Sequence, residues 1–209
     1  MKSYGQFCGL ARALDTVGDR WTLLVVRELL IADRSYGEMH RALDGVPTNL
    51  LADRLRALER DGIVERRPDP ADRRRAAYAL TARGRELEPA VLALVRWGGE
   101  LMVSGRGQDR FEPHWLLLAL RALLRGPADG ADGTVAVACD GEPVGAVVVR
   151  GGRRDVVPGS SGARAAVDGP AELLLGVASG HLDVGSALDA GLVVEGRPTL
   201  VRRLLSPSR

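Results

Sequence analysis

The order of short patterns between residues 35 and 80 limits the fold more than any other feature of the chain. Ser35 is followed three residues later by Glu38, which is the capping-box signature of a helix start. After a turn at Val46–Pro47, residues 48–61 place leucines on one helical face, and Gly62 ends the helix. Residues 63–67 and 76–80 have the pattern of paired strands. Helix, turn, helix and a two-stranded wing predict a winged helix-turn-helix.

Further helices are expected before and after the segment of residues 35–80. Apolar residues recur at helical spacing over 10–17 and 21–30, and again over 87–102. The last of these helices carries apolar and small residues at intervals near four and three, which is compatible with a seam between two helices. Those residues are Leu87, Val91, Leu94, Gly98 and Leu101. The alternative is that this face only covers its own domain.

The predicted helix-turn-helix indicates binding to double-stranded DNA. Its second helix would enter the major groove while the wing reaches neighbouring phosphates. Thr48 and Asn49 stand at the start of that helix, where side chains can reach base edges. The expected DNA contacts are Thr48, Asn49, Arg54, Arg56, Arg60, Arg66, Arg73, Arg74 and Arg75. The alternative is a solvated surface on which these arginines pair with Asp53, Glu59, Asp61 and Asp72.

The composition of the chain changes near residues 104–109, a polar stretch with two glycines that is typical of a linker between domains. We therefore expect one domain over 1–104, mainly α, and a second over 110–209, of the α+β class. The sequence of the second half predicts an apolar helix from residue 115 and a hairpin that pairs residues 133–139 with 143–149. A third strand is expected at 163–167, then helices, a strand at 192–196 and a final helix at 199–205. The first three strands are expected to form a sheet with one helix-covered face.

Composition narrows the class of protein. The chain has 209 residues, 45% of them hydrophobic, and a formal net charge of +2, so charge alone does not indicate a nucleic-acid binder. It has no apolar run that could span a membrane and no export signal, which predicts a cytoplasmic protein without a membrane partner. Metal-ligand spacings and catalytic or cofactor-binding motifs are absent from the sequence. We expect no enzymatic activity and no cofactor.

Many positions of the first half follow one ordered pattern, namely Cys8, 13–15, 17–18, 20–24, 27–29, Pro47, 50–51, 54–55, 58–59, 62–64, 78–81 and Gly84. This pattern resembles that of the HxlR family of bacterial regulators, relatives of the MarR group. The resemblance covers about half of the chain. It implies a dimeric winged-helix transcription factor, with dimer contacts from the first helix and from the long helix after the wing.

The second half resembles the sterol carrier protein type 2 domain at residues 176–183, 187–188, 190–191, 194–196 and Leu204. That family encloses a hydrophobic tunnel, so the resemblance implies an apolar small-molecule effector. The residues expected to line the site are Trp115, Leu118, Val147, Val149, Leu174, Leu175 and Leu188. The alternative is that they fill an ordinary core.

Cys8 lies where some HxlR relatives have a redox switch, and Arg12 one turn later could stabilise its thiolate. The alternative is a small buried hydrophobic residue. The other cysteine, Cys139, is far away in the sequence, so the two do not suggest a disulfide framework.

Together these patterns predict a homodimeric transcription regulator that binds operator DNA and whose affinity for DNA responds to an apolar effector. Two alternatives stay open. In one, the chain is a lipid or small-molecule carrier whose winged helix mediates protein association. In the other, the second domain is only a dimer spacer.

Overall fold

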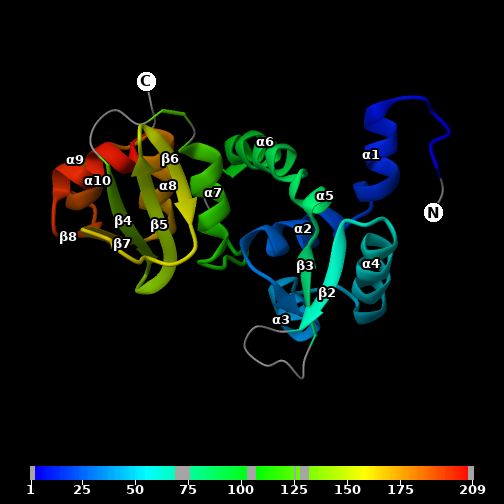
Figure 1. The fold of residues 1–209 in the computed structure, drawn as a ribbon. Helices are drawn as coiled ribbons and strands as arrows, with labels where there is room; N and C mark the ends of the chain where they lie inside the picture. The colour runs from blue at the N-terminus through cyan, green and yellow to red at the C-terminus, as the bar shows by residue number, and fades with distance from the viewer. Residues whose placement is uncertain (1–2, 69–75, 103–106, 125, 128–131, 207–209) are drawn as a thin grey trace. The chain divides into compact units, whose positions relative to one another are not determined.

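The structure is a computed structural model that describes residues 3–68, 76–102, 107–124, 126–127 and 132–206. It divides into two compact units, residues 1–91 and 92–209 (Figure 1). The division falls within helix α6 (Glu88–Gly99). The domain limits expected from the sequence, 1–104 and 110–209, stay predictions.

The first unit begins with α1 (Gly9–Val17) and α2 (Thr22–Ile31), followed by α3 (Tyr36–Ala42) and α4 (Thr48–Arg60). All four helices agree with the sequence pattern to within one or two residues. The α4 face that carries Leu51, Leu55 and Leu58 is fully buried, so these leucines fix the helix on the core. The turn between α3 and α4 buries Val46.

The wing is built from β2 (Val64–Pro68) and β3 (Ala76–Leu80), which pair antiparallel as expected. A third strand, β1 (Arg34–Ser35), was not predicted and pairs with the other edge of β3, which gives the order β1-β3-β2. Two residues are too few to produce an alternating pattern, so the sequence carries no signal for β1. The tip, including Arg73, Arg74 and Arg75, lies outside the described residues.

A short helix that the sequence analysis did not predict, α5 (Ala82–Arg85), follows β3 and leads to α6 and a 3-10 turn, η1 (Glu100–Met102). The position of Gly84 in α5 has no room for a side chain. A Cβ atom there would lie 2.2 Å from the carbonyl oxygen of Ile63. The long helix expected over 87–102 is shorter in the structure. It ends at Gly99, because two consecutive glycines weaken its end, and continues only as the 3-10 turn.

The second unit contains a five-stranded sheet with the order β6-β5-β4-β7-β8. Its strands are β4 (Gly133–Cys139), β5 (Glu142–Arg150), β6 (Arg153–Val157), β7 (Ala165–Gly169) and β8 (Val193–Glu195). The hairpin of β4 and β5 across Asp140–Gly141 agrees with the prediction. The expected three-stranded sheet is corrected to five strands. Charged residues at three of its five positions hid β6, and β8 pairs with β7 rather than standing apart.

Helices cover one face of this sheet. They are α7 (Trp115–Leu123), α8 (Ala171–Ser179), α9 (Val184–Asp189) and α10 (Pro198–Leu205). A Cβ atom at Gly145 would meet Leu117 of α7, and one at Gly133 would meet Leu200 of α10. Both glycines share a sheet face with the buried Val135, Val137 and Val147, so this is the covered face (Figure 1). None of the described helices is long and apolar enough to cross a membrane.

Candidate nucleic-acid interface

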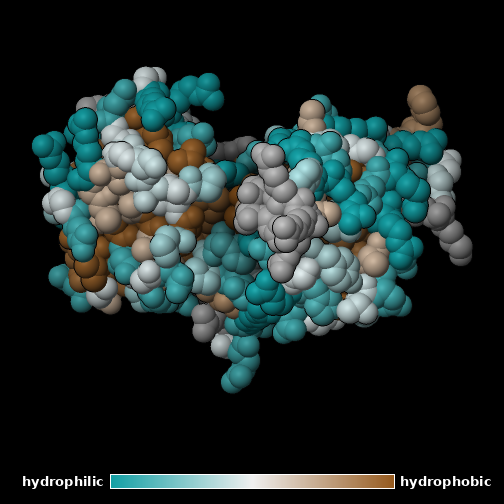
Figure 2. All heavy atoms as spheres, turned by 60° about the horizontal axis from the view of Figure 1, so that its bottom comes forward, coloured by the Kyte–Doolittle hydropathy of each residue, from teal (hydrophilic) through white to brown (hydrophobic). Residues whose placement is uncertain are grey.

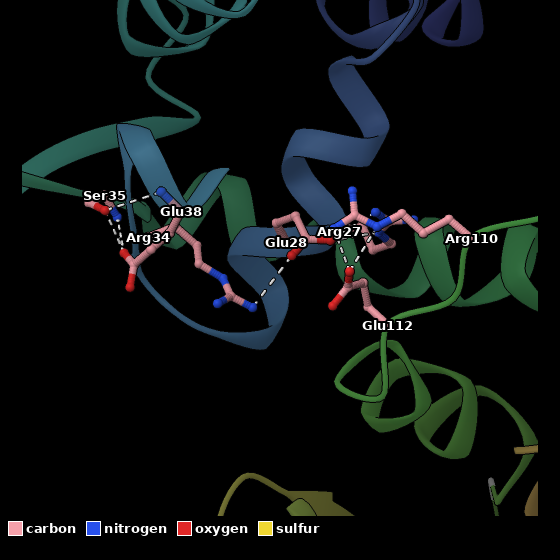
Figure 3. A network of polar contacts seen from close by, with 7 residues as sticks. All are labelled: Arg27, Glu28, Arg34, Ser35, Glu38, Arg110 and Glu112. Carbon is pink, nitrogen blue, oxygen red and sulfur yellow. Dashed lines mark hydrogen bonds and ion pairs between the residues drawn. The ribbon is translucent and has the colours of Figure 1, made fainter. Parts of the chain in front are cut away.

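The candidate interface starts at the turn between α3 and α4. The Ser35 side chain accepts a hydrogen bond from the Glu38 N–H, and the Glu38 carboxylate accepts one from the Ser35 N–H at 2.7 Å (Figure 3). The Ser35 hydroxyl also donates a hydrogen bond to the Glu38 carboxylate at 2.6 Å, and this bond, together with the one from the Ser35 N–H, holds the pKa of the Glu38 carboxyl below its usual value. The first residue of α3, Tyr36, donates its hydroxyl to the Thr48 carbonyl at 2.8 Å. The start of α3 is thereby tied to the start of α4.

The face of α4 opposite its leucines is open to solvent. Thr48, Asn49, Asp53, Arg56 and Arg60 are all exposed. Asp53 and Arg56 form an ion pair of 3.2 Å within the helix, so part of the positive charge is neutralised locally. The amide N–H groups at the first turn of a helix are free to bind an anion such as phosphate. The exposed residues and this helix end form one continuous polar strip.

Arg54 has a different position from the other predicted contacts on this helix. It forms an ion pair with Asp19 in the loop between α1 and α2, and its side chain is only 22% exposed. Its Nε atom is buried without a hydrogen-bond partner among the described residues. The structure therefore gives Arg54 a role in fixing α4 to the α1–α2 loop. Nothing local in the sequence marks Asp19 as its partner.

The wing places Arg66 beside an aromatic ring. Arg66 and Tyr78 are directly opposite each other on β2 and β3, and the guanidinium carbon lies 5.5 Å from the ring centroid. This is the distance of a cation–π contact. Arg34 of β1 faces Tyr78 from the other side, so Arg34, Tyr78 and Arg66 form a row across three strands. Tyr78 is not among the site residues expected from the sequence, although aromatic residues in strands commonly pack on cross-strand neighbours.

A buried carboxylate holds the inner end of this row. Glu28 on α2 is completely buried. Its carboxylate oxygens form ion pairs with a guanidinium nitrogen of Arg27 at 2.8 Å and with one of Arg34 at 3.4 Å (Figure 3). A buried carboxylate requires such partners, because an uncompensated charge inside a protein is strongly unfavourable. Glu28 thus connects α2 to the strand that flanks the wing. No pattern in the sequence predicts this role of Glu28.

The residues expected to bind an apolar effector lie elsewhere, in the second unit. Leu118, Val147, Val149 and Leu174 are fully buried. Trp115 is half-buried, with ring centroids of Phe111 and His114 at 6.2 and 5.9 Å, and Leu175 and Leu188 are also half-buried. Val147 and Val149 are on the helix-covered face of the sheet. Their part in ligand binding stays a prediction.

Cys8 is exposed at the start of α1, whereas Cys139 is buried in the second unit. Backbone N–H groups of Ala11 and Leu10 lower the pKa of the Cys8 thiol from its ordinary value. Arg12, the partner suggested by the sequence, lies 3.6 Å from Asp15 instead. Burial raises the pKa of Cys139 to about 11, with nearby carboxylates adding to the shift.

Comparisons with known proteins agree with the geometry of the first unit. The family of HxlR-like helix-turn-helix proteins matches residues 16–105. An uncharacterized HTH-type transcriptional regulator of Mycobacterium tuberculosis H37Rv is 41% identical over 98 residues, which are 47% of this chain. The chain spans 61% of the length of that relative.

Two further similarities concern shorter relatives. An uncharacterized HTH-type transcriptional regulator of Synechocystis is 38% identical over 46% of this chain and 71% of the relative. A solved structure of a regulator assigned to the MarR family, from Enterococcus faecalis V583, is 33% identical, covers 48% of this chain and 94% of its own, and has a TM-score of 0.40. With the helix-turn-helix and wing described above, the sequence match establishes that this chain belongs to the HxlR-like helix-turn-helix family.

Proposed function

We propose that this chain is a transcriptional regulator that binds operator DNA through α4 and the wing. The observation that carries the proposal is the division of α4 into two faces. Its leucines are buried, while Thr48, Asn49, Arg56 and Arg60 are exposed on a helix that follows a capped helix and a tight turn. A helix of this kind can enter the major groove, and Arg66 on the adjacent wing strand can contact phosphate.

We further propose that the protein acts as a homodimer on a pseudopalindromic operator. Two groups of exposed apolar side chains support this. Phe7, Leu10 and Leu14 are on or next to α1, and Leu94 and Trp97 on α6 are 50% and 67% exposed. Apolar groups of this size on a surface commonly mark an interface. A two-fold dimer would present α4 to successive half-sites about one helical turn apart.

The regulation by an apolar effector that the sequence suggests belongs to the same proposal. A ligand changes DNA affinity only if it binds the DNA-competent and DNA-incompetent states with different affinities, typically by about 1–3 kcal/mol. The resemblance of the second half to the sterol carrier protein type 2 domain supports the second unit as the place for such a ligand.

The test is fluorescence anisotropy with the duplex upstream of the gene and an unrelated duplex of equal length, over a salt series. We expect the upstream duplex to bind at least about a thousandfold more tightly, with an affinity that falls steeply as salt rises. Equal, salt-insensitive binding to both duplexes would contradict the proposal and favour the small-molecule carrier.

Two variants separate base contacts from phosphate contacts. Asn49→Ala is expected to weaken specific binding by about 1–3 kcal/mol and to leave the salt slope unchanged. Arg66→Ala is expected to lower the salt slope by about one unit on any duplex. Arg202→Ala, an exposed arginine on α10, is the control and should change neither quantity.

A further inference from the structure

The face of the second unit's sheet opposite its helices carries an open groove of about 500 Å³. The groove is formed by the outward side chains of two paired strands and by the loop over residues 158–161. Those side chains are Ala146, Val148 and Arg150 on β5 and Arg153, Asp155 and Val157 on β6. Its volume is within the range of small-molecule sites. None of the seven residues expected from the sequence to bind an effector lines it.

The groove has two chemically different parts. Ala146 and Val157 are cross-strand partners, and together with Val148 they make an apolar floor. Figure 2 shows hydrophobic surface, in brown, exposed within a hydrophilic surround on the unit that contains this sheet. Ala146 is buried, whereas Val148 and Val157 are half-buried, so a ligand with an apolar part would gain free energy by covering these two valines.

The other part is positively charged. Arg150 and Arg153 are directly opposite each other on the two strands, and both are exposed. Like charges in this arrangement destabilise a sheet. No ion pair joins either arginine to another residue in the described part of the chain. An anion between the two guanidinium groups would remove the repulsion and accept hydrogen bonds from both.

Asp155, the only carboxylate among the described residues that line the groove, forms no ion pair with Arg150 or Arg153. Asp155 accepts a hydrogen bond from the Val156 N–H at 2.8 Å, so one of its oxygens is already engaged with its own backbone. Two arginines against one aspartate leave the groove with a net positive charge. We propose that this groove binds a small amphipathic carboxylate, with its tail on the floor of Ala146, Val148 and Val157 and its carboxylate between Arg150 and Arg153.

This site differs from the proposed effector site, because the two are on opposite faces of the sheet. Val148 faces the groove, whereas Val147 and Val149 face the helices. Binding to the groove also requires no DNA. A failure of this proposal is therefore distinguishable from a failure of the proposed function.

The experiment uses the full chain with methyl-labelled valine, titrated with sodium decanoate below its micelle concentration and followed by NMR. We expect the methyl signals of Val148 and Val157 to shift and those of Val147 and Val149 to stay in place. Decanol, which has the tail without the charge, should bind about tenfold more weakly or worse, and decyltrimethylammonium should not bind. Shifts confined to Val147 and Val149, or equal affinity for decanoate and decanol, would overturn the proposal.

Variants test the two parts separately. Arg150→Gln and Arg153→Gln should each weaken decanoate about tenfold and leave decanol unchanged, and each should raise the melting temperature of the ligand-free protein because a like-charge pair is removed. Val148→Asn should weaken both ligands, because it makes the floor polar. Arg202→Gln on the helix-covered side is the charge-matched control. Unchanged decanoate affinity in both arginine variants would exclude the charged part of the site.

Discussion

At the scale of single residues, the environment of a side chain decides its chemistry more than its type does. The two cysteines illustrate this. Cys8 is exposed at a helix start whose N–H groups lower the pKa of its thiol, while burial raises the pKa of Cys139 to about 11. Since the thiolate is the reactive form, the two should differ widely in reactivity at neutral and mildly alkaline pH.

We predict that iodoacetamide labels Cys8 much faster than Cys139 in the native protein. The Cys8 rate should rise through a pKa below that of an ordinary thiol, since its thiolate forms as pH rises through that lowered value. Cys139 should react appreciably only near pH 11 or after unfolding. Mass spectrometry of the two peptides after timed labelling measures both rates. Equal labelling of the two cysteines at pH 8 would contradict the prediction.

Glu28 is the second case at this scale. Glu28→Gln should lower the free energy of unfolding of the first unit by roughly 2–3 kcal/mol, because Arg27 and Arg34 lose their buried counter-charge while staying partly solvated. Urea unfolding followed by circular dichroism measures the loss. Glu86→Gln, at an exposed position, is the matched control and should stay within about 0.5 kcal/mol of wild type. A loss no larger than that of the control would show that Glu28 does not anchor β1.

At the scale of elements, the strands of the wing place the ring of Tyr78 where it can position the side chain of Arg66. Tyr78 stands between Arg34 and Arg66 in the row across β1, β3 and β2. An exposed cation–π contact contributes about 0.5–1 kcal/mol, which restricts the directions available to the Arg66 side chain. Arg66 would then reach DNA with less loss of side-chain entropy.

We predict that Tyr78→Leu weakens DNA binding by about two- to fivefold without changing the fold, because the arginine loses its aromatic support. In the Arg66→Ala background the same substitution should have no further effect. Anisotropy on the four proteins of this double-mutant cycle measures the coupling. Additive effects would mean that Tyr78 acts on DNA binding by some other route.

At the scale of the whole molecule, the exposed apolar side chains of α1 and α6 bear on assembly. Val91 is buried within the chain, whereas Leu94 and Leu101 of the same predicted seam are 50% and 70% exposed. The sequence pattern therefore contains both a residue of the internal core and residues left for another surface. This distinction favours the dimer seam over simple covering of the domain.

We predict that the wild-type chain sediments as a dimer and that Leu10→Glu and Trp97→Glu each shift it toward the monomer, because a charge in an apolar interface is unfavourable. Ala82→Glu, on the exposed surface of α5, is the control and should leave the dimer intact. Sedimentation velocity over a concentration series measures the equilibrium. A wild-type monomer at all concentrations would rule out the homodimer.

The sequence by itself determined the local elements of the first unit. The capping box at Ser35, the leucine face of α4 and the strands on either side of the wing tip depend on residues a few positions apart, and short-range periodicity reports such elements directly. The same holds for the β4–β5 hairpin, whose turn at Asp140–Gly141 is a local signal.

Only the tertiary structure decided which side chains meet. The pairing of Arg54 with Asp19, the row of Arg34, Tyr78 and Arg66, and the groove between β5 and β6 join residues whose separation in the sequence follows no fixed period. Such contacts depend on how strands are registered and how helices pack, and a one-residue change of register would move every side chain to the opposite face. For that reason the sequence indicated a basic helix and wing, but the structure was needed to separate arginines that fix the fold from those that face solvent.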